Sequence, residues 1–485
     1  MTKYKMVING KHVDSESGKW FDSINPANEE TIARFPNGTE KDVARAVDAA
    51  ESAYDAWSRM PAPKRGDILL RAAQILAKRK EELALLEAAE MGKVLSECRG
   101  DVQEAIDVTE YMAGEGRRLF GHTTKSELPN KFAMTVRSPI GVCGLITPWN
   151  FPMAIPAWKL MPALICGNTV IFKPSSDTPL CALRLVEILI EAGVPKGVIN
   201  FVTGGGGTVG KEIVISKKIR AISFTGSRDT GLWITKNAGI KKIGLELGGK
   251  NAIVIMKDAD LKPALDGVLW GAFGTTGQRC TATSRVIIYE GLRKKFEKAI
   301  VARAKKIRIG NGWDKKTEMG PLINRDGLEK TQKYVQIGKD EGAKLVCGGN
   351  ALKRKGFFHQ PTIFTNVDTD MRIAQEEIFG PVLSIISFSK FEEAIEKVND
   401  IDYGLSAAIY TNNIANAFEF IERAESGLVY VNASTIGAEV HLPFGGMKQT
   451  GNGTREGGIE GINEFSEVKT VYVDYSGKLQ KAQID

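Results

Sequence analysis

Short apolar runs alternate with helical stretches between Val142 and Met256, and this alternation constrains the fold more than any other feature of the sequence. The pattern predicts strands at 142–146, 169–173, 198–203, 221–225 and 252–256, with helices at 157–165, 179–192, 209–215 and 230–238. Consecutive strand–helix–strand units form a parallel sheet with right-handed crossovers. Because such sheets bind ligands at the carboxyl ends of their strands, we expect a nucleotide-binding α/β unit here.

Three other regions complete the expected architecture. Thr39 and Asp42 form a capping-box pattern before a helix, and a helical pattern also covers 68–93. Beyond 258, helices expected at 261–273 and 292–306 and strands at 285–289 and 429–432 predict a second α/β unit. The stretches 126–137 and 468–475 alternate like edge strands, which is typical of an arm between domains or subunits.

Composition excludes several classes of protein. Of 485 residues, 43% are hydrophobic and 25% are charged, as in globular proteins, and the net charge is only +7. We expect neither nucleic acid nor a membrane as a partner, because basic residues are not interleaved with aromatics and no stretch reaches roughly 18 apolar residues. The six cysteines and four histidines are scattered, so we expect no metal site. We expect no secretory signal and a cytoplasmic protein.

A glycine-rich turn follows the third expected strand. Gly205, Gly207 and Gly210 match the pattern G-x-G-x-x-G between a strand and a helix, the context of a dinucleotide-binding turn. The match is weak, because four glycines are consecutive at 204–207 and the next strand ends without an acidic residue for a ribose. A tight turn with close helix packing explains the glycines equally well.

Two other strand ends carry groups suited to a charged ligand. The segment Phe224-Thr225-Gly226-Ser227 leads directly into a helix, so that Gly226 and Ser227 can offer backbone N–H groups to a pyrophosphate. Lys173 ends another strand, and we favour a ligand role for it over a solvated charge.

Three residues have side chains suited to acyl chemistry. Cys280 lies among small and polar residues, which favours an accessible thiol, although a buried and inert cysteine is the commoner case. Glu246 has apolar neighbours, and burial would raise its pKa toward the range of a general base; surface exposure is the alternative. Asn150 follows a strand and can present a fixed amide donor to an oxyanion.

Seven motifs occur in an order that resembles the NAD(P)-dependent aldehyde dehydrogenase superfamily. They are Pro148-Trp149-Asn150-Phe151-Pro152, Lys173-Pro174, Phe224-Thr225-Gly226-Ser227, Glu246-Leu247-Gly248-Gly249-Lys250, Gly277-Gln278-Arg279-Cys280, Glu376-Glu377-Ile378-Phe379-Gly380-Pro381 and Pro443-Phe444-Gly445-Gly446. The resemblance implies an α/β fold with a Rossmann-like parallel-sheet cofactor domain, a second α/β catalytic domain and a small β oligomerisation arm. The cofactor domain would comprise 1–120 and 140–248, the catalytic domain 249–448, and the arm 121–139 and 464–485, giving a homodimer or homotetramer.

The resemblance also implies catalytic roles. Cys280 would attack the aldehyde to form a thiohemiacetal and then a thioester. The Asn150 amide and the Cys280 N–H would hold the oxyanion, and Glu246 would activate water for hydrolysis. Lys159 and Glu456 would form an auxiliary proton path, although the stretch 447–454 is one residue longer than in many family members.

The family's cofactor positions carry over to a set of residues along one groove: Thr147, Pro148, Trp149, Lys173, Ser175, Ser176, Gly207, Gly210, Phe224, Thr225, Gly226, Ser227, Leu247, Glu377 and Phe379. Lys173 and Ser176 would bind the adenosine ribose. Family members strict for NAD often have a glutamate where Ser176 stands, and a glutamate repels a 2′-phosphate. We therefore expect NADP as cofactor, with NAD also accepted, and no metal.

The pocket motifs resemble most the branch that oxidises 2,5-dioxopentanoate (α-ketoglutarate semialdehyde). Arg279 is a candidate partner for the carboxylate of this small aldehyde, but an arginine here can equally point away and brace the loop. The other implied pocket residues are Thr281, Ile155, Trp158 and Phe444. A succinate semialdehyde dehydrogenase, a broad-range aldehyde dehydrogenase and a CoA-acylating relative are alternative enzymes, and the acylating branch tends to lack a base such as Glu246. A catalytically inactive scaffold or binding protein is the alternative from another class.

Overall fold

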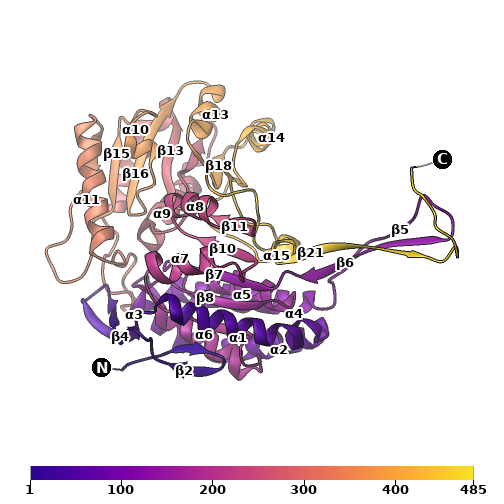
Figure 1. Cartoon of the computed structure of the whole chain (residues 1–485). Helices are drawn as coiled ribbons and strands as arrows, with labels where there is room; N and C mark the ends of the chain where they lie inside the picture. Colours follow the sequence, from indigo (N-terminus) through magenta and orange to yellow (C-terminus); the bar gives the residue numbers. More distant parts are fainter. Residues whose placement is uncertain (1, 484–485) are drawn as a thin grey trace.

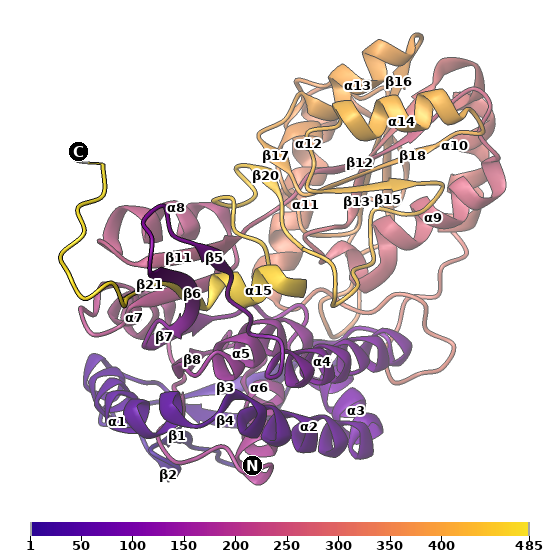
Figure 2. The ribbon, with the colours of Figure 1, turned by 90° about the vertical axis from the view of Figure 1, so that its right-hand side faces the viewer.

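Two seven-stranded sheets dominate the structure, a computed structural model that describes residues 2–483. The first has the order β11-β10-β7-β8-β9-β1-β2 and the second has the order β14-β15-β16-β13-β12-β18-β19. Figure 1 shows the two units beside each other, with a long arm projecting from the body. In Figure 2, the unit of the second sheet lies above helices α2, α3 and α4 of the first.

Five parallel strands form the centre of the first sheet. They are β7 (Val142–Ile146), β8 (Thr169–Lys173), β9 (Ile199–Phe201), β10 (Ala221–Thr225) and β11 (Lys242–Glu246). Strands β1 (Met6–Ile8) and β2 (Lys11–Val13) extend the sheet in antiparallel fashion beyond β9. Because β8 and β10 flank β7 on opposite sides, the strand order reverses between β7 and β10, and this is where an open parallel sheet binds its ligand.

Helices cover both faces of this sheet. They are α1 (Glu40–Arg59), α2 (Ala62–Lys78), α3 (Lys80–Glu90), α4 (Leu95–Glu115), α5 (Ala154–Ile165), α6 (Pro179–Glu191), the π-helical turn η1 (Gly206–Gly210), α7 (Lys211–Ile215) and α8 (Arg228–Asn237). Leu145 and Phe172 pack into one core with α2, α4, α5 and α6, whereas Ile146 and Ile171 pack into another with α1 and α7. Successive side chains of a strand point to opposite faces, so these nearly continuous apolar strands require a helical layer on each side.

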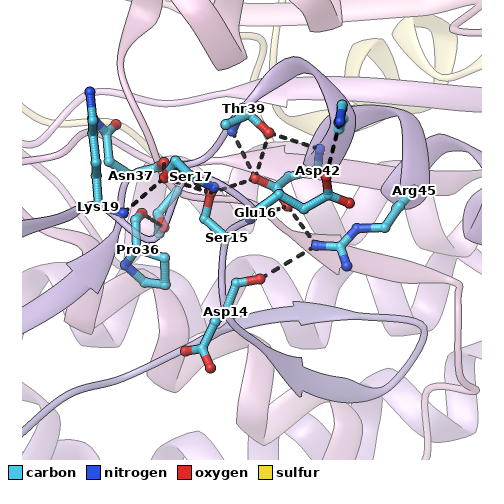
Figure 3. A network of polar contacts seen from close by, with 12 residues as sticks. Asp14, Ser15, Glu16, Ser17, Lys19, Pro36, Asn37, Thr39, Asp42 and Arg45 are labelled. Atoms are coloured by element: carbon cyan, nitrogen blue, oxygen red, sulfur yellow. Dashed lines mark hydrogen bonds and ion pairs between the residues drawn. The ribbon is translucent and has the colours of Figure 1, made fainter.

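Helix α1 begins at a network of polar contacts around Asp42 (Figure 3). The Thr39 hydroxyl accepts from the Asp42 N–H, and the Asp42 carboxylate accepts from the Thr39 N–H at 2.8 Å, which confirms the capping box. Ser15 and Arg45 also donate to this carboxylate, at 2.7 Å and 2.5 Å. Burial opposes the charge, but these bonds outweigh it and lower the pKa of Asp42. The network thereby fastens the segment after β2 to the start of α1.

The second sheet contains β12 (Asn251–Ile255), β13 (Thr283–Tyr289), β14 (Lys344–Cys347), β15 (Thr362–Thr365), β16 (Val382–Phe388), β18 (Ser406–Tyr410) and β19 (Leu428–Val431). All neighbours are parallel except β14 and β15. Its helices are α9 (Leu261–Phe273), α10 (Glu290–Ala304), α11 (Arg325–Asp340), α12 (Arg372–Gln375), α13 (Phe391–Asn399) and α14 (Ile414–Arg423). Ile253 packs with α9 and α10, and Val254 packs with α11, α13 and α14, so this sheet too is covered on both faces.

The arm consists of β5 (Thr123–Lys125), β6 (Lys131–Pro139) and the C-terminal strand β21 (Ser466–Asp474). Strand β21 follows helix α15 (Gly458–Glu464) and pairs with β6 over its whole length, from Ser466 opposite Pro139 to Asp474 opposite Lys131. Phe132, Val468 and Tyr472 are exposed apolar side chains on this arm. The remaining short elements are β3 (Trp20–Asn25) with β4 (Glu30–Pro36), β17 (Tyr403–Gly404) with β20 (Met447–Lys448), and the 3-10 turn η2 (Gly274–Gly277).

The structure confirms the expected fold class and corrects several elements. Strands 142–146, 169–173 and 221–225 and helix 261–273 have the predicted bounds. The strand predicted at 252–256 begins at Asn251 and belongs to the second sheet, while β11 occupies the place expected for it in the first. The sequence reading missed β11 because Lys242-Ile243-Gly244-Leu245-Glu246 has only two apolar residues. The helical pattern over 68–93 is two helices, which meet at Arg79.

Two further properties concern the chain as a whole. All six cysteines are free thiols. Within residues 2–483, no helix has both the length and the apolar character that crossing a membrane requires.

Candidate active site

A cavity of about 840 Å³ lies at the carboxyl edge of the first sheet. The segments after β7, β8 and β10 and the turn η1 line it, through Thr147, Pro148, Trp149, Lys173, Ser175, Ser176, Gly207, Gly210, Phe224, Thr225 and Gly226. Four other predicted cofactor residues, Ser227, Leu247, Glu377 and Phe379, line an adjoining cavity of about 300 Å³. That cavity also contains Cys280 and Asn150, so the groove leads from the strand ends to the thiol.

The glycines at 204–207 have two different roles: one is needed for packing, and others line the cavity. A Cβ at Gly204 would lie 2.6 Å from the Val209 side chain, so Gly204 is required by packing. A Cβ at Gly206 or Gly207 would meet no atom within 4 Å, because both residues border the open cavity. Close helix packing therefore does not account for Gly206 and Gly207, whose backbone is open to the cavity.

The polar groups of this groove fit a dinucleotide. Ser227 caps α8, whose first N–H groups and positive helix end border the cavity at Gly226. Lys173 is buried at the end of β8, where its ammonium donates to the Pro174 carbonyl at 2.9 Å, and burial lowers its pKa to about 8. Near the thiol, Glu377 accepts from the Gly249 N–H at 2.9 Å, and burial raises its pKa.

Cys280 follows a turn with an unusual backbone. Thr275, Thr276 and Gly277 all have positive φ angles, of 50°, 58° and 69°. Such conformations cost about 1–3 kcal/mol each for residues other than glycine, so surrounding contacts must hold them. The Thr275 N–H donates to Glu97 at 2.9 Å, Gln278 Oε1 accepts from the Ile323 N–H at 2.9 Å, and Asn251 Nδ2 donates to the Cys280 carbonyl at 2.7 Å. The thiol therefore lies on a fixed loop.

The thiol is partly buried, and its surroundings disfavour the thiolate. Burial, together with the charges of Glu377 and Glu246, raises the pKa of Cys280 to about 12. Asn150 donates from Nδ2 to the Gln278 carbonyl at 3.0 Å, which places its amide against the loop that carries the thiol.

Glu246 ends β11 in a cavity of about 110 Å³ that it shares with Cys280 and Glu456. Both of its carboxylate oxygens are buried and have no hydrogen-bond partner among the described residues. Burial and the nearby Glu456 raise the pKa of Glu246 well above its usual value. A carboxyl group in these surroundings can accept a proton near neutral pH.

The structure brings Lys159 and Glu456 together as a buried ion pair. Lys159 Nζ also donates to Ser223 Oγ at 2.8 Å. Glu464, which the sequence reading missed, lies beside this pair, and burial raises its pKa to about 7. No local sequence signal marks Glu464, because only the packing of α15 against α5 brings it here.

The predicted pocket residues Ile155, Trp158, Arg279, Thr281 and Phe444 all line the cavity of Cys280. The rings of Trp158 and Phe444 are 5.8 Å apart in an edge-to-face arrangement. Arg279 also braces the loop, because Nε donates to Thr275 Oγ1 at 2.9 Å and Nη2 pairs with Glu97 at 3.2 Å. Arg279 can therefore both brace the loop of Cys280 and line the cavity in which a substrate carboxylate would lie.

Helices α3 and α4 contribute acidic residues that the sequence reading missed. Asp101 of α4 and Glu87 of α3 hold the buried ammonium of Lys93 at 2.9 Å and 2.7 Å, and Lys93 donates to the Asn150 carbonyl at 3.0 Å. Glu104 itself lines the cavity of Cys280 and Glu246. The spacing of Glu97, Asp101 and Glu104 places all three on one helix face, a signal that the sequence does contain.

Within residues 2–483, no three His, Cys, Asp or Glu side chains gather in a way that could hold a metal ion.

The fold and site together fit an enzyme with a dinucleotide groove beside a thiol, and comparisons with known proteins identify its family. Residues 12–471 match the model of the aldehyde dehydrogenase family. A 2,5-dioxopentanoate dehydrogenase of Saccharolobus solfataricus is 44% identical, over 94% of this chain and 96% of its own. A betaine aldehyde dehydrogenase of Bacillus subtilis is 42% identical, over 96% of both chains. The betaine aldehyde dehydrogenase of Staphylococcus aureus, solved in complex with NAD+, superimposes with a TM-score of 0.96 at 38% identity, covering 99% of this chain and 97% of its own.

The chain belongs to the aldehyde dehydrogenase family. It is therefore an aldehyde-oxidising oxidoreductase.

Proposed function

We propose that the protein oxidises 2,5-dioxopentanoate to 2-oxoglutarate, with NADP as cofactor and NAD accepted as well. One observation carries the chemical part of this proposal: the thiol of Cys280, the amide of Asn150 and the carboxyl group of Glu246 lie around adjoining cavities that continue into the groove at the strand ends. The Glu246 carboxyl group has no hydrogen-bond partner among residues 2–483. The similarity to the Saccharolobus enzyme and the position of Arg279 in the cavity support the substrate.

In this proposal, the Cys280 thiolate attacks the aldehyde carbon and forms a thiohemiacetal. The Asn150 amide and the Cys280 N–H donate to the developing oxyanion. NAD(P) supplies the hydride acceptor, and loss of hydride leaves a thioester on Cys280. Glu246 takes a proton from water, which hydrolyses the thioester to the acid, and Lys159 with Glu456 passes protons away from this carboxyl group. A raised pKa at Glu246 suits this role, because the carboxylate must be basic enough to accept the proton.

The proposal assigns the cofactor domain to 1–120 and 140–248, the catalytic domain to 249–448 and the arm to 121–139 and 464–485. The exposed apolar side chains of the arm support assembly into a homodimer or homotetramer. Light scattering of the purified protein distinguishes these states from a monomer.

The substrate is tested by NAD(P)H formation with a panel of aldehydes, which comprises 2,5-dioxopentanoate, succinate semialdehyde, an aliphatic aldehyde, an aromatic aldehyde and betaine aldehyde. We expect the highest kcat/KM with 2,5-dioxopentanoate and no turnover by Cys280→Ser. Equal rates over neutral aldehydes would leave the cysteine chemistry in place and overturn the substrate.

The cofactor preference is tested at Ser176, which lines the groove beside Lys173. We expect Ser176→Glu to lower kcat/KM with NADP more than with NAD, since a carboxylate repels the 2′-phosphate. A strong NAD preference that this substitution leaves unchanged would contradict the NADP proposal.

A further inference from the structure

The cavity of Cys280 and Glu246 contains a carboxyl group that the proposed mechanism does not use. Glu104 comes from α4 and lines the cavity together with Trp158, Arg279 and Phe444. The other two carboxyl groups of this cavity, Glu246 and Glu456, already have roles in proton transfer. Glu104 therefore faces the substrate without a task in the chemistry.

Charged groups surround Glu104 from several elements. Asp101 lies one turn earlier on α4, Lys93 precedes that helix, and Arg279 comes from the loop of Cys280 with its partner Glu97. Burial and the negative charge of Asp101 raise the pKa of Glu104 to about 7, against the opposing effects of Trp158, Lys93 and Arg279. Both protonation states are therefore populated in the physiological pH range.

Two donors in the same cavity have unused N–H groups. The indole Nε1 of Trp158 is buried beside the Glu104 carboxyl group and makes no hydrogen bond of regular geometry among residues 2–483. The hydrogen bonds of Arg279 within that part of the chain use Nε and Nη2, which leaves Nη1 for a ligand. A buried donor without a well-aligned acceptor is unfavourable, and an oxygen-rich substrate end would supply that acceptor. The cavity thus favours a ligand that accepts hydrogen bonds at its far end.

We propose that Glu104 determines specificity in the aldehyde pocket: as a neutral acid it donates a hydrogen bond to the carboxylate of an acidic aldehyde, and as a carboxylate it repels that group. This inference rests on the proposed function, because it supplies the recognition of the acidic substrate. It also adds a property that the substrate alone does not imply, namely that selectivity for acidic over neutral aldehydes falls as the pH rises.

The two protonation states of Glu104 explain why the selectivity for acidic aldehydes should fall as the pH rises. Below neutral pH, Glu104 is protonated and joins Trp158 and Arg279 as a third donor. Above neutral pH it is ionised and places a like charge beside the substrate carboxylate. Titration of Cys280 changes turnover of acidic and neutral aldehydes alike, and any effect of Glu246, which lines the same cavity, remains in Glu104→Gln. The difference between the wild type and Glu104→Gln in the ratio of the two kcat/KM values therefore isolates Glu104.

The test measures kcat/KM for 2,5-dioxopentanoate and for butanal between about pH 6 and pH 8.5, in the wild type, Glu104→Gln and Glu110→Gln. Glu110 is exposed on the same helix and provides the matched control. We expect the acidic-to-neutral ratio to fall about tenfold over this range in the wild type and in the control, and to stay constant in Glu104→Gln. A ratio independent of pH in the wild type, or an unchanged decline in Glu104→Gln, would overturn the inference.

Failure of the inference and failure of the proposed substrate give different results. If butanal is preferred at every pH but the ratio still declines and Glu104→Gln abolishes the decline, the role of Glu104 stands and the substrate is wrong. If 2,5-dioxopentanoate is preferred and the ratio is constant in all three proteins, the substrate stands and the role of Glu104 is wrong. Thermal melting and the KM for NADP show whether each variant remains folded, and inhibition by 2-oxoglutarate provides a second readout: its Ki should rise with pH in the wild type and not in Glu104→Gln.

Discussion

The two sheets have the same size and a similar parallel core, but they meet the candidate site with opposite ends. The first sheet contributes residues at the carboxyl ends of its strands: Lys173 ends β8, Thr225 ends β10 and Glu246 ends β11. The second contributes residues before its strands begin: Cys280 precedes β13 by three residues, and Phe379 precedes β16 by three. The usual rule for parallel sheets therefore locates the nucleotide side of the site and not the thiol side.

The chain path explains this difference. Only four residues, 247–250, connect the end of β11 at Glu246 with the start of β12 at Asn251. A connection of this length spans at most roughly 17 Å, so the carboxyl edge of the first sheet must face the amino edge of the second. Carboxyl ends followed by helices supply helix N-termini for phosphate, whereas the amino edge supplies loops, which need their own bracing. The contacts of Glu97, Gln278 and Asn251 provide this bracing around Cys280.

The largest expected effect is at Cys280, on the amino edge of the second sheet. We expect Cys280→Ser to lower turnover by more than about 10⁴-fold, because a serine hydroxyl is much less acidic and a much weaker nucleophile than a thiol. The matched control is Cys347→Ser, a buried cysteine of β14 in the same sheet, which should keep most of its activity. Steady-state NAD(P)H formation measures both, and substantial turnover by Cys280→Ser would place the nucleophile elsewhere.

A second variant removes support from the carboxyl edge. Burial opposes the charge of Lys93, but Asp101 and Glu87 outweigh it and raise its pKa, so Lys93→Met would leave two buried carboxyl groups without their cation. Removing one partner of a buried ion pair costs about 3–5 kcal/mol of unfolding free energy. Denaturant unfolding should show this loss, and Lys78→Met, at an exposed position, should not. Equal stability of the two variants would mean that the ion cluster contributes little to the fold beneath Asn150.

Glu246→Gln separates the role of Glu246, at the carboxyl edge of the first sheet, from that of Cys280, at the amino edge of the second, within one turnover. Glutamine cannot accept a proton from water, so we expect steady-state turnover to fall by about 10²- to 10³-fold. Formation of the thioester needs no activated water, so a burst of about one equivalent of NAD(P)H should persist if another group takes the proton of the Cys280 thiol, whose pKa is raised to about 12. Rapid-mixing absorbance measures the burst. Loss of the burst together with the turnover would show that Glu246 acts before hydrolysis.

The pH dependence of alkylation measures how reactive the Cys280 thiol is. Because the pKa of Cys280 is raised to about 12, its thiolate fraction at neutral pH is small and increases about tenfold per pH unit. The rate at which iodoacetamide labels the cofactor-free protein should therefore also increase about tenfold per pH unit between about pH 7 and pH 9. Peptide mass spectrometry identifies the labelled residue, and a rate that is already constant above pH 7 would mean that the thiolate is stabilised in the free enzyme.

The smallest effect concerns the layer that supports the first sheet. Thr39→Ala removes the hydroxyl that caps α1 and should lower the unfolding free energy by about 1 kcal/mol. Thr39→Ser keeps the cap and should restore most of this loss. Thermal melting of the two variants measures the difference, and identical melting temperatures would show that the contacts of Ser15 with Asp42 hold the helix start without Thr39.

The sequence by itself determined three central strands of the first sheet and the type of chemistry. The strands at 142–146, 169–173 and 221–225 are recognisable because they are short and buried on both faces, which makes them continuous apolar runs. The ordered motifs around Asn150, Glu246 and Cys280 are local in the sequence, so the resemblance to the family could be recognised without a structure.

Only the tertiary structure decided which distant groups meet. Glu464 reaches Lys159 through the packing of α15 against α5, and β11 forms a strand although its sequence is weakly apolar, because β10 pairs with it. Burial of carboxyl groups such as Glu104 depends on neighbours from several elements, which no local pattern specifies. Local propensity and motif spacing are properties of short segments, whereas the opposition of the two sheet edges and the pKa values of the site arise from contacts between residues far apart in the chain.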